Sequence, residues 1–249
     1  MLYVPVGSKA LYEAADYWKE FKEIVEVEGM MDASILDNAL YADDVTVYPD
    51  GATCFPILMK SEESITNIQF DVVLPEGITI KNSTLTDRKG SDHTITTSSV
   101  NGATRFIVTS MGGQVFSDND GAVINLSLDI DKNLAPGHRG ITLRNVTLST
   151  TGAVKVNTPA CTAILSVSDI ESGDADGDGV TDVNDVTSTI NHILKKPVAS
   201  FVRGAADVDG DSVIDVNDVQ ATIDKALGKT ASSRGTDRQE ETEPALDPQ

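Results

Sequence analysis

The chain has 249 residues, enough for two modest domains, and 40% of them are hydrophobic, which suffices for ordinary folded cores. Acidic residues number 39 against 19 basic ones, so the formal net charge at pH 7 is −20. Such a charge repels nucleic acid and anionic membranes and attracts cations, and no apolar run approaches the ~20 residues that a membrane-spanning helix needs. The composition therefore excludes a nucleic-acid partner and membrane insertion.

The first segment, residues 1–33, predicts a strand, a helix and a second strand. LYVPV alternates between apolar and polar positions, ALYEAADYWKEF has helical spacing, and EIVEV alternates again. Leu11, Ala15 and Trp18 fall on one helical face, which Phe21 continues, and the segment is too small to bury that face alone. It resembles the closing segment of the leucine-rich-repeat surface proteins of gut anaerobes. That resemblance implies a short α/β cap whose true N-terminus lies upstream.

Residues 44–168 predict an all-β domain. Short segments rich in Val, Ile and Thr are separated by Gly, Asn, Asp and Pro turns. At that spacing, two sheets packed face to face are the expected architecture. The candidate strands are VTVYP, CFPILMK, NIQFDVVLP, ITIKNSTLT, HTITTSS, TRFIVTSM, AVINLSLDI, GITLRNVTLST and TAILSVS.

The order of motifs in this region resembles a cohesin-like sandwich of the jelly-roll type. NIQFDVVLPEGI is similar to the family's "F.L.YD...L" strand, GAVINLSLDI to a late strand, and LAPGHRGITLRNVTLS to its closing segment. A different sandwich of the same superfamily is the alternative. Sugar platforms use exposed Trp and Tyr, whereas this region has no Trp and only one Tyr, so a carbohydrate-binding role is weakly indicated. Its aromatic residues are Tyr48 and the expected core residues Phe55, Phe70, Phe106 and Phe116.

Cys54 and Cys161 are the only cysteines, and neither belongs to a CxxC pair, so zinc and redox motifs are poorly supported. The two residues flank the β-rich region. Two outcomes stay open: a disulfide that closes the domain if its first and last strands are neighbours, or two buried free thiols.

Residues 169–229 contain an internal repeat with a period of 33 residues. DADGDGVTDVNDVTSTINHILKK aligns without a gap with DVDGDSVIDVNDVQATIDKALGK, which indicates a duplicated supersecondary unit. The remaining residues, 230–249, are polar and have no hydrophobic period, so they predict a disordered tail.

Each repeat opens with aspartates at alternate positions, as in a 12-residue calcium loop. Calcium takes six to eight oxygen ligands, magnesium gives up its water shell reluctantly, and thiolate or imidazole metals lack their ligands here. A solvated acidic loop is the competing interpretation, but it does not explain two copies in register, each followed by an amphipathic helix. The sequence therefore predicts two bound calcium ions. The expected ligands are Asp174, Asp176, Asp178, Val180 (by its carbonyl), Asp182 and Asp185 in loop 1, and Asp207, Asp209, Asp211, Val213 (by its carbonyl), Asp215 and Asp218 in loop 2.

The loops differ from a full EF-hand, because position 12 is Asp instead of Glu and no amphipathic helix precedes either loop. A duplicated loop followed by a helix resembles the type I dockerins, which implies a small all-α module. One departure is Ser212 in loop 2, where loop 1 has Gly179. That position normally needs a positive φ, which costs a non-glycine residue roughly 1 kcal/mol. Loop 2 is therefore expected to bind calcium more weakly.

The helices are expected to begin near Asp182 and Asp215, which suit an N-cap. Their apolar stripes are expected to pack the two helices together. In dockerins, positions 10 and 11 of each loop determine the partner, and here both loops carry the same Val–Asn pair. That identity predicts two equivalent docking modes, whereas the competing interpretation places both valines in the core. The stripes are Val186, Ile190, Ile193 and Leu194, then Val219, Ile223 and Leu227, and the partner-binding pairs are Val183 with Asn184 and Val216 with Asn217.

No catalytic motif is present: His93, His138 and His192 are scattered, and GxSxG, P-loop and HExxH patterns are absent. The sequence start also lacks the features of a signal peptide. We therefore expect a non-enzymatic fragment of a secreted or cell-surface bacterial protein that makes calcium-dependent protein–protein contacts, without a small-molecule substrate. The partner is a cohesin-type domain in trans or the chain's own sandwich. The alternatives are a calcium-stabilised structural cap of a surface adhesin, with the module packed on its own sandwich, and a carbohydrate-binding module.

Overall fold

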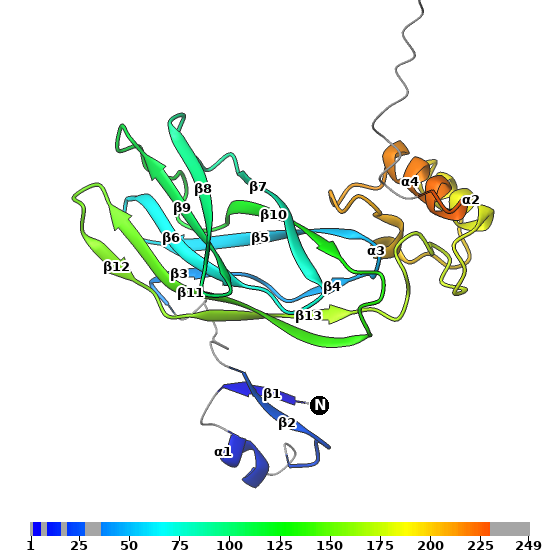
Figure 1. Ribbon diagram of the computed structural model, residues 1–249, viewed down its shortest axis with the longest axis horizontal. Coiled ribbons are helices and arrows are strands. Elements are labelled where there is room, and N and C mark those ends of the chain that lie inside the picture. The colour runs from blue at the N-terminus through cyan, green and yellow to red at the C-terminus, as the bar shows by residue number, and fades with distance from the viewer. Residues whose placement is uncertain (1, 6–8, 16–18, 28–35, 230–249) are drawn as a thin grey trace, which may run out of the picture.

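The computed structural model describes residues 2–5, 9–15, 19–27 and 36–229. A small α/β unit, a β-sandwich and a helical module follow one another along the chain (Figure 1). None of the described helices combines the length and the apolar character that a bilayer crossing requires. The tail predicted after residue 229 lies outside the described residues.

In the N-terminal unit, β1 (Leu2–Pro5) pairs in parallel with β2 (Ile24–Val27), and α1 (Lys9–Ala14) lies between them in the chain. The predicted helix is too long, because α1 ends at Ala14 and the Phe21 side chain is 41% exposed. A helix of fewer than two turns cannot carry one apolar face as far as Phe21. Trp18 lies outside the described residues, as does the side chain of Leu11.

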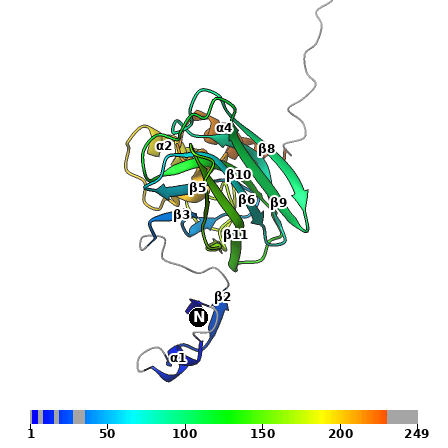
Figure 2. The same cartoon turned by 90° about the vertical axis from the view of Figure 1, so that its left-hand side faces the viewer.

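Two sheets packed face to face form the sandwich (Figures 1 and 2). All strand pairs in it are antiparallel except that of β4 with β13. The four-stranded sheet has the order β3 (Asn38–Tyr41), β5 (Ala52–Ser61), β10 (Ala122–Ile130) and β7 (Ile78–Leu85). The second sheet has the order β4 (Val45–Val47), β13 (Cys161–Val167), β11 (Gly137–Thr150), β6 (Ile65–Val73), β9 (Ala103–Ser110) and β8 (His93–Val100), with β12 (Lys155–Asn157) paired to β11.

Every strand that the sequence predicts in this region is present, and the two-sheet architecture is confirmed. The sandwich begins before the predicted boundary at residue 44, because β3 pairs with β5 from Asn38 opposite Ser61 to Tyr41 opposite Leu58. Strands β3 and β12 were not predicted. Each has only three or four residues, too few to show an apolar alternation.

The core lies between the two sheets and is built from the inward positions of each strand. In β6, Ile68, Phe70 and Val72 alternate inward and are at most 1% exposed. The core assignment of the four phenylalanines is confirmed, because none is more than 6% exposed. The two cysteines are free thiols: Cys54 lies on β5 and Cys161 on β13 of the opposite sheet.

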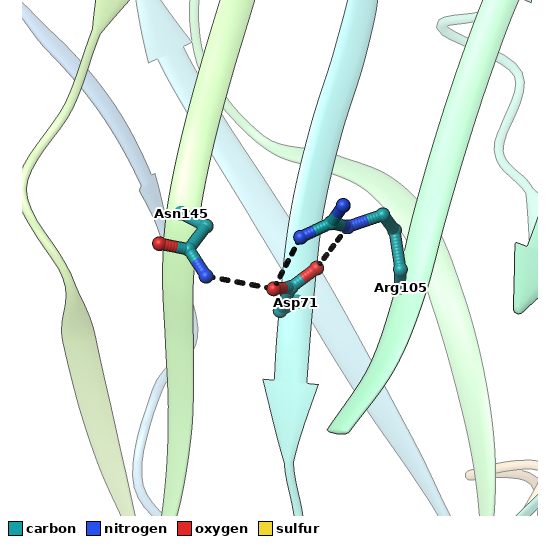
Figure 3. A network of polar contacts seen from close by, with 3 residues as sticks. All are labelled: Asp71, Arg105 and Asn145. Carbon is teal, nitrogen blue, oxygen red and sulfur yellow. Dashed lines mark hydrogen bonds and ion pairs between the residues drawn. The ribbon is translucent and has the colours of Figure 1, made fainter. Parts of the chain in front are cut away.

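An ion pair between a buried carboxylate and a half-buried guanidinium lies within the larger sheet (Figure 3). Arg105 on β9 donates to both carboxylate oxygens of Asp71 on β6, over 2.6 and 2.9 Å. On the other side, Asn145 Nδ2 donates to Asp71 over 2.7 Å. The register of β11 shifts at this point, and Asn145 adopts a φ of 53°. The Arg105 guanidinium, and to a smaller extent Asn145, holds the pKa of Asp71 below its ordinary value.

Asp71→Asn is expected to destabilise the sandwich by about 1–3 kcal/mol at pH 7, because Arg105 loses its charged acceptor. The folded-state pKa of Asp71 is lowered, so its contribution is present above the unfolded pKa of about 3.9 and is lost as the pH falls. Urea unfolding of both proteins between pH 7 and pH 3 should show the difference shrinking below about pH 4. Asp129→Asn, at an exposed position on β10, is the control and should change stability little. A constant difference down to pH 3 would contradict the assignment.

Candidate calcium loops and the exposed helix faces

The C-terminal module contains two long helices, α2 (Val183–Ile193) and α4 (Val216–Ala226), and the short α3 (Arg203–Ala206) between them. Helices α2 and α4 pack against each other, and each follows one aspartate-rich loop. We call residues 174–185 loop 1 and residues 207–218 loop 2.

Both long helices begin at the predicted N-caps. Asp182 accepts a hydrogen bond from Asn184 N, and Asp185 accepts one from Asp182 N, which completes a capping box. The second repeat builds the same box with Asp215 and Asp218. The last expected ligand of each loop therefore also fixes the first turn of its helix.

In loop 1, two buried carboxylates organise the backbone. Asp174 is 2% exposed and accepts hydrogen bonds from Gly177 N, Asp178 N and Gly179 N over 2.8–3.1 Å. Asp185 is fully buried and also accepts from the backbone of Asp176 over 3.0 Å. These bonds curl the loop so that carboxylate oxygens converge. Asp174, Asp176 and Asp185 each offer one oxygen within 4.8 Å of the others.

Loop 2 gathers a different trio. Asp207, Asp209 and Asp211 each offer one oxygen within 4.8 Å of the others. Asp218 is fully buried and accepts from Val208 N over 2.8 Å. Asp207 Oδ2 accepts from the Ser212 amide, but its Oδ1 is buried without a hydrogen-bond partner in the described structure.

The structure thus brings together half of the expected ligands in each loop. The remaining expected ligands lie outside the two trios. The side chains of Val180 and Val213 are 60% and 57% exposed, which suits residues expected to act through their carbonyls. The ligands outside the trios are Asp178, Val180 and Asp182 in loop 1 and Val213, Asp215 and Asp218 in loop 2.

In both trios, negatively charged carboxylates lie close together without a neighbouring cation, which is electrostatically unfavourable. Burial, followed by the charge of Asp218, raises the pKa of Asp207, and the same two causes raise that of Asp209. In loop 1, burial followed by the charge of Asp185 raises the pKa of Asp176. No Lys or Arg forms an ion pair with these ligands within the described part of the chain. The unpaired Asp207 Oδ1 and the all-oxygen donor set fit a hard divalent cation such as calcium.

The backbone at position 6 has the conformation that the sequence predicts. Gly179 has a φ of 91° and Ser212 a φ of 73°. Ser212 therefore adopts the left-handed region, which disfavours residues with a Cβ. The weaker calcium affinity of loop 2 follows as a prediction from this strain.

The prediction that the apolar stripes pack the two helices together holds only in part, because Val186, Val219 and Ile223 are half-buried whereas the other four stripe residues are exposed. Much of their apolar surface is exposed, including 56% of Leu194 and 63% of Leu227. The buried positions of α2 and α4 are instead acidic or hydroxyl-bearing: Asp185, Thr189, Asp218 and Thr222. Hydrophobic periodicity identified the stripes correctly, but it does not say whether the covering surface belongs to the same chain.

The expected partner-binding valines are among the most exposed apolar residues. Val183 is 70% exposed and Val216 is 72% exposed. Their amide neighbours Asn184 and Asn217 are exposed as well. The competing interpretation, in which the two valines belong to the core, is therefore wrong.

No protein-family model matches the sequence, and no curated protein matches it. Solved structures that resemble this one include a non-cellulosomal cohesin from the archaeon Archaeoglobus fulgidus, with 8% identity and a TM-score of 0.46 over 53% of this chain and 92% of that chain. The sixth cohesin of scaffoldin B from Acetivibrio cellulolyticus, in complex with a dockerin, has 14% identity and a TM-score of 0.47 over 53% of this chain and 100% of that chain. A type I cohesin–dockerin complex from Clostridium thermocellum has 10% identity and a TM-score of 0.48 over 53% of this chain and 100% of that chain.

Proposed function

We propose that this chain is a calcium-dependent protein–protein assembly unit of a secreted or cell-surface bacterial protein. Its helical module, residues 169–229, would bind a cohesin-type β-sandwich domain of another protein, without catalysing a reaction. The observation that carries the proposal is the presence of the same exposed Val–Asn pair in both repeats, at positions 10 and 11 of each aspartate-rich loop.

Each pair continues into an apolar stripe along its helix. Residues 183 and 190 are seven apart, so they share one face of α2, and the exposed Leu194 is the C-cap of that helix. Residues 216 and 223 repeat the spacing on α4, where Ile223 is half-buried and the exposed Leu227 is the C-cap. Exposed apolar residues that gather at one end of a loop and along the helix after it are typical of a protein-binding site. Two such surfaces in one module support two equivalent docking modes.

Calcium would control this surface through the start of each helix. Asp182 and Asp215 are both N-caps and expected ligands, and the Val–Asn pair follows each of them immediately. An ion held by the loop would thus fix the position of the pair without contacting it. This arrangement supports calcium dependence of partner binding.

Partner binding in trans is favoured because the chain's own sandwich contacts other parts of the module. Hydrogen bonds join the sandwich to Ser172, Val208, Gly210 and Lys225, none of which belongs to the Val–Asn pairs. The same contacts favour a second function, a calcium-stabilised structural cap in which the module is anchored to its sandwich. A sugar platform lacks support, because the Phe and Tyr residues of the described sandwich are buried or half-buried.

Calorimetric titration of the full chain should detect two calcium ions, with loop 2 binding more weakly. Ser212→Gly should tighten the weaker site by about fivefold, because glycine adopts the positive φ without the cost of roughly 1 kcal/mol. Gly179→Ser is the reciprocal control and should weaken the stronger site by a similar factor. Fewer than two sites, or an unchanged weaker site in Ser212→Gly, would count against the proposal.

A further inference from the structure

Loop 2 forms a contact with the sandwich that loop 1 does not form. Cys54 N on β5 donates to Gly210 O over 2.9 Å, and Ala52 N donates to Val208 O over 3.5 Å. Strand β3 pairs only with residues 58–61 of β5, so loop 2 occupies the part of that edge that β3 leaves open. We call these two hydrogen bonds the loop 2–β5 contact.

Close packing at this contact depends on glycine. A Cβ added at Gly210 would lie 2.3 Å from Ala52 O, and one added at Gly204 would lie 2.3 Å from Tyr48 Cε2. Both distances are far below van der Waals contact. A side chain at position 210 would meet the backbone of β5 and push the module away from the sandwich, whereas one at position 204 would displace the Tyr48 ring. The glycine at position 210 thus permits an approach that any other residue would prevent.

Polar groups tie the flanks of the same contact. Lys225 Nζ on α4 lies 2.5 Å from Asp50 Oδ2 and also donates to the Asp50 carbonyl. Ser172 N donates to Pro49 O over 2.9 Å. The module is therefore held at its first turn, at its second loop and at its last helix.

The equivalent carbonyls of the two repeats have different partners. In loop 1, the carbonyl of Ala175 accepts from Val202 N over 2.8 Å, which is a bond within the module. In loop 2, the carbonyl of Val208 occupies the same place in the repeat and receives its donor from the sandwich. Loop 2 thus depends on the sandwich for a bond that loop 1 obtains inside the module.

We propose that calcium binding by loop 2 and docking of the module on β5 stabilise each other, so that the ion fixes the module to its own sandwich. This inference rests on the proposed function. The acceptor carbonyls of Val208 and Gly210 alternate with the expected ligands Asp207, Asp209 and Asp211 along one stretch of backbone. Calcium binding and docking both order this stretch of backbone, so the one that forms first lowers the entropic cost of the other. By linkage, each increases the affinity of the other by the same factor.

Two consequences follow for the molecule. The sandwich helps loop 2 to hold calcium despite the unfavourable φ of Ser212. The docked module also keeps both Val–Asn pairs exposed, so anchoring and partner binding are compatible.

Amide hydrogen exchange of the full-length wild-type chain tests whether calcium stabilises the loop 2–β5 contact. The Cys54 amide should exchange at least about tenfold more slowly in calcium than in excess chelator, because its acceptor is in loop 2. The Ile68 amide, in β6 of the opposite sheet, is the internal control and should not change. Equal Cys54 exchange in both conditions, in a chain that binds calcium, would overturn the inference.

Calcium titration of full-length charge variants tests whether docking of the module raises the calcium affinity of loop 2. Lys225→Asp should weaken the weaker calcium site by about fivefold or more, although the added negative charge alone would attract calcium. Asp50→Lys combined with Lys225→Asp should restore the affinity, and Lys229→Asp, beside Asp224, is the matched control. An unchanged or tighter weaker site in Lys225→Asp would overturn the coupling alone. Absence of calcium binding by the wild type would overturn the proposed function and this inference together.

Discussion

Removal of calcium is expected to unfold the helical module and leave the sandwich folded. The module has almost no apolar core: its buried hydrophobic residues are three alanines and Val208. Asp174, Asp185 and Asp218 are at most 2% exposed, so the module buries carboxylates where other small domains bury apolar side chains. Without a cation, burial and mutual repulsion of these groups oppose folding, whereas a saturating ion adds about 4 kcal/mol at a thousand times its dissociation constant.

Circular dichroism of the full chain can follow this transition, because α2 and α4 are the longest described helices. In excess chelator, most of the helical signal at 222 nm should disappear and should return on calcium addition. Magnesium at the same concentration is the control and should restore little, since it keeps its water shell. A full helical signal in chelator would show that the module folds without the ion.

Replacement of both Val–Asn pairs by charged residues is expected to abolish partner binding, with a loss of several kcal/mol if the pairs are the anchors. A change in one pair alone should weaken binding only about twofold, because the second docking mode remains and only half of the binding orientations are lost. The variants are Val183→Asp with Asn184→Lys, Val216→Asp with Asn217→Lys, and all four changes together.

Binding of the three variants to a panel of purified cohesin-type domains, alongside their melting temperatures, separates docking from folding. Both valines are at least 70% exposed, so the melting temperatures should stay close to that of the wild type. Met111→Asp, at a 92% exposed apolar position on the sandwich, is the control and should bind normally. If the variants lost stability in step with binding, the proposed docking surface would be refuted. Undiminished binding by the variant with all four substitutions would refute it as well.

Local patterns in the sequence were sufficient for the elements that depend on near neighbours. Apolar alternation predicted the long strands, because one face of each is covered by the opposite sheet. The aspartate repeat predicted the loops and both N-caps, since Asp182 and Asp215 act within three residues of themselves. Ser212 was identified as strained for the same reason, and its φ of 73° agrees.

Other features required the tertiary structure, because they join residues that are distant in the chain. Strand β3 exists through its pairing with β5, and Asn145 reaches Asp71 because β11 changes register. The exposure of the helix stripes was also invisible in the sequence, since periodicity defines an apolar face without naming what covers it. The loop 2–β5 contact is the clearest case. Nothing in a repeat of two similar loops indicates that one of them completes the open edge of a strand more than 150 residues earlier; only the folded chain brings Gly210 against Cys54.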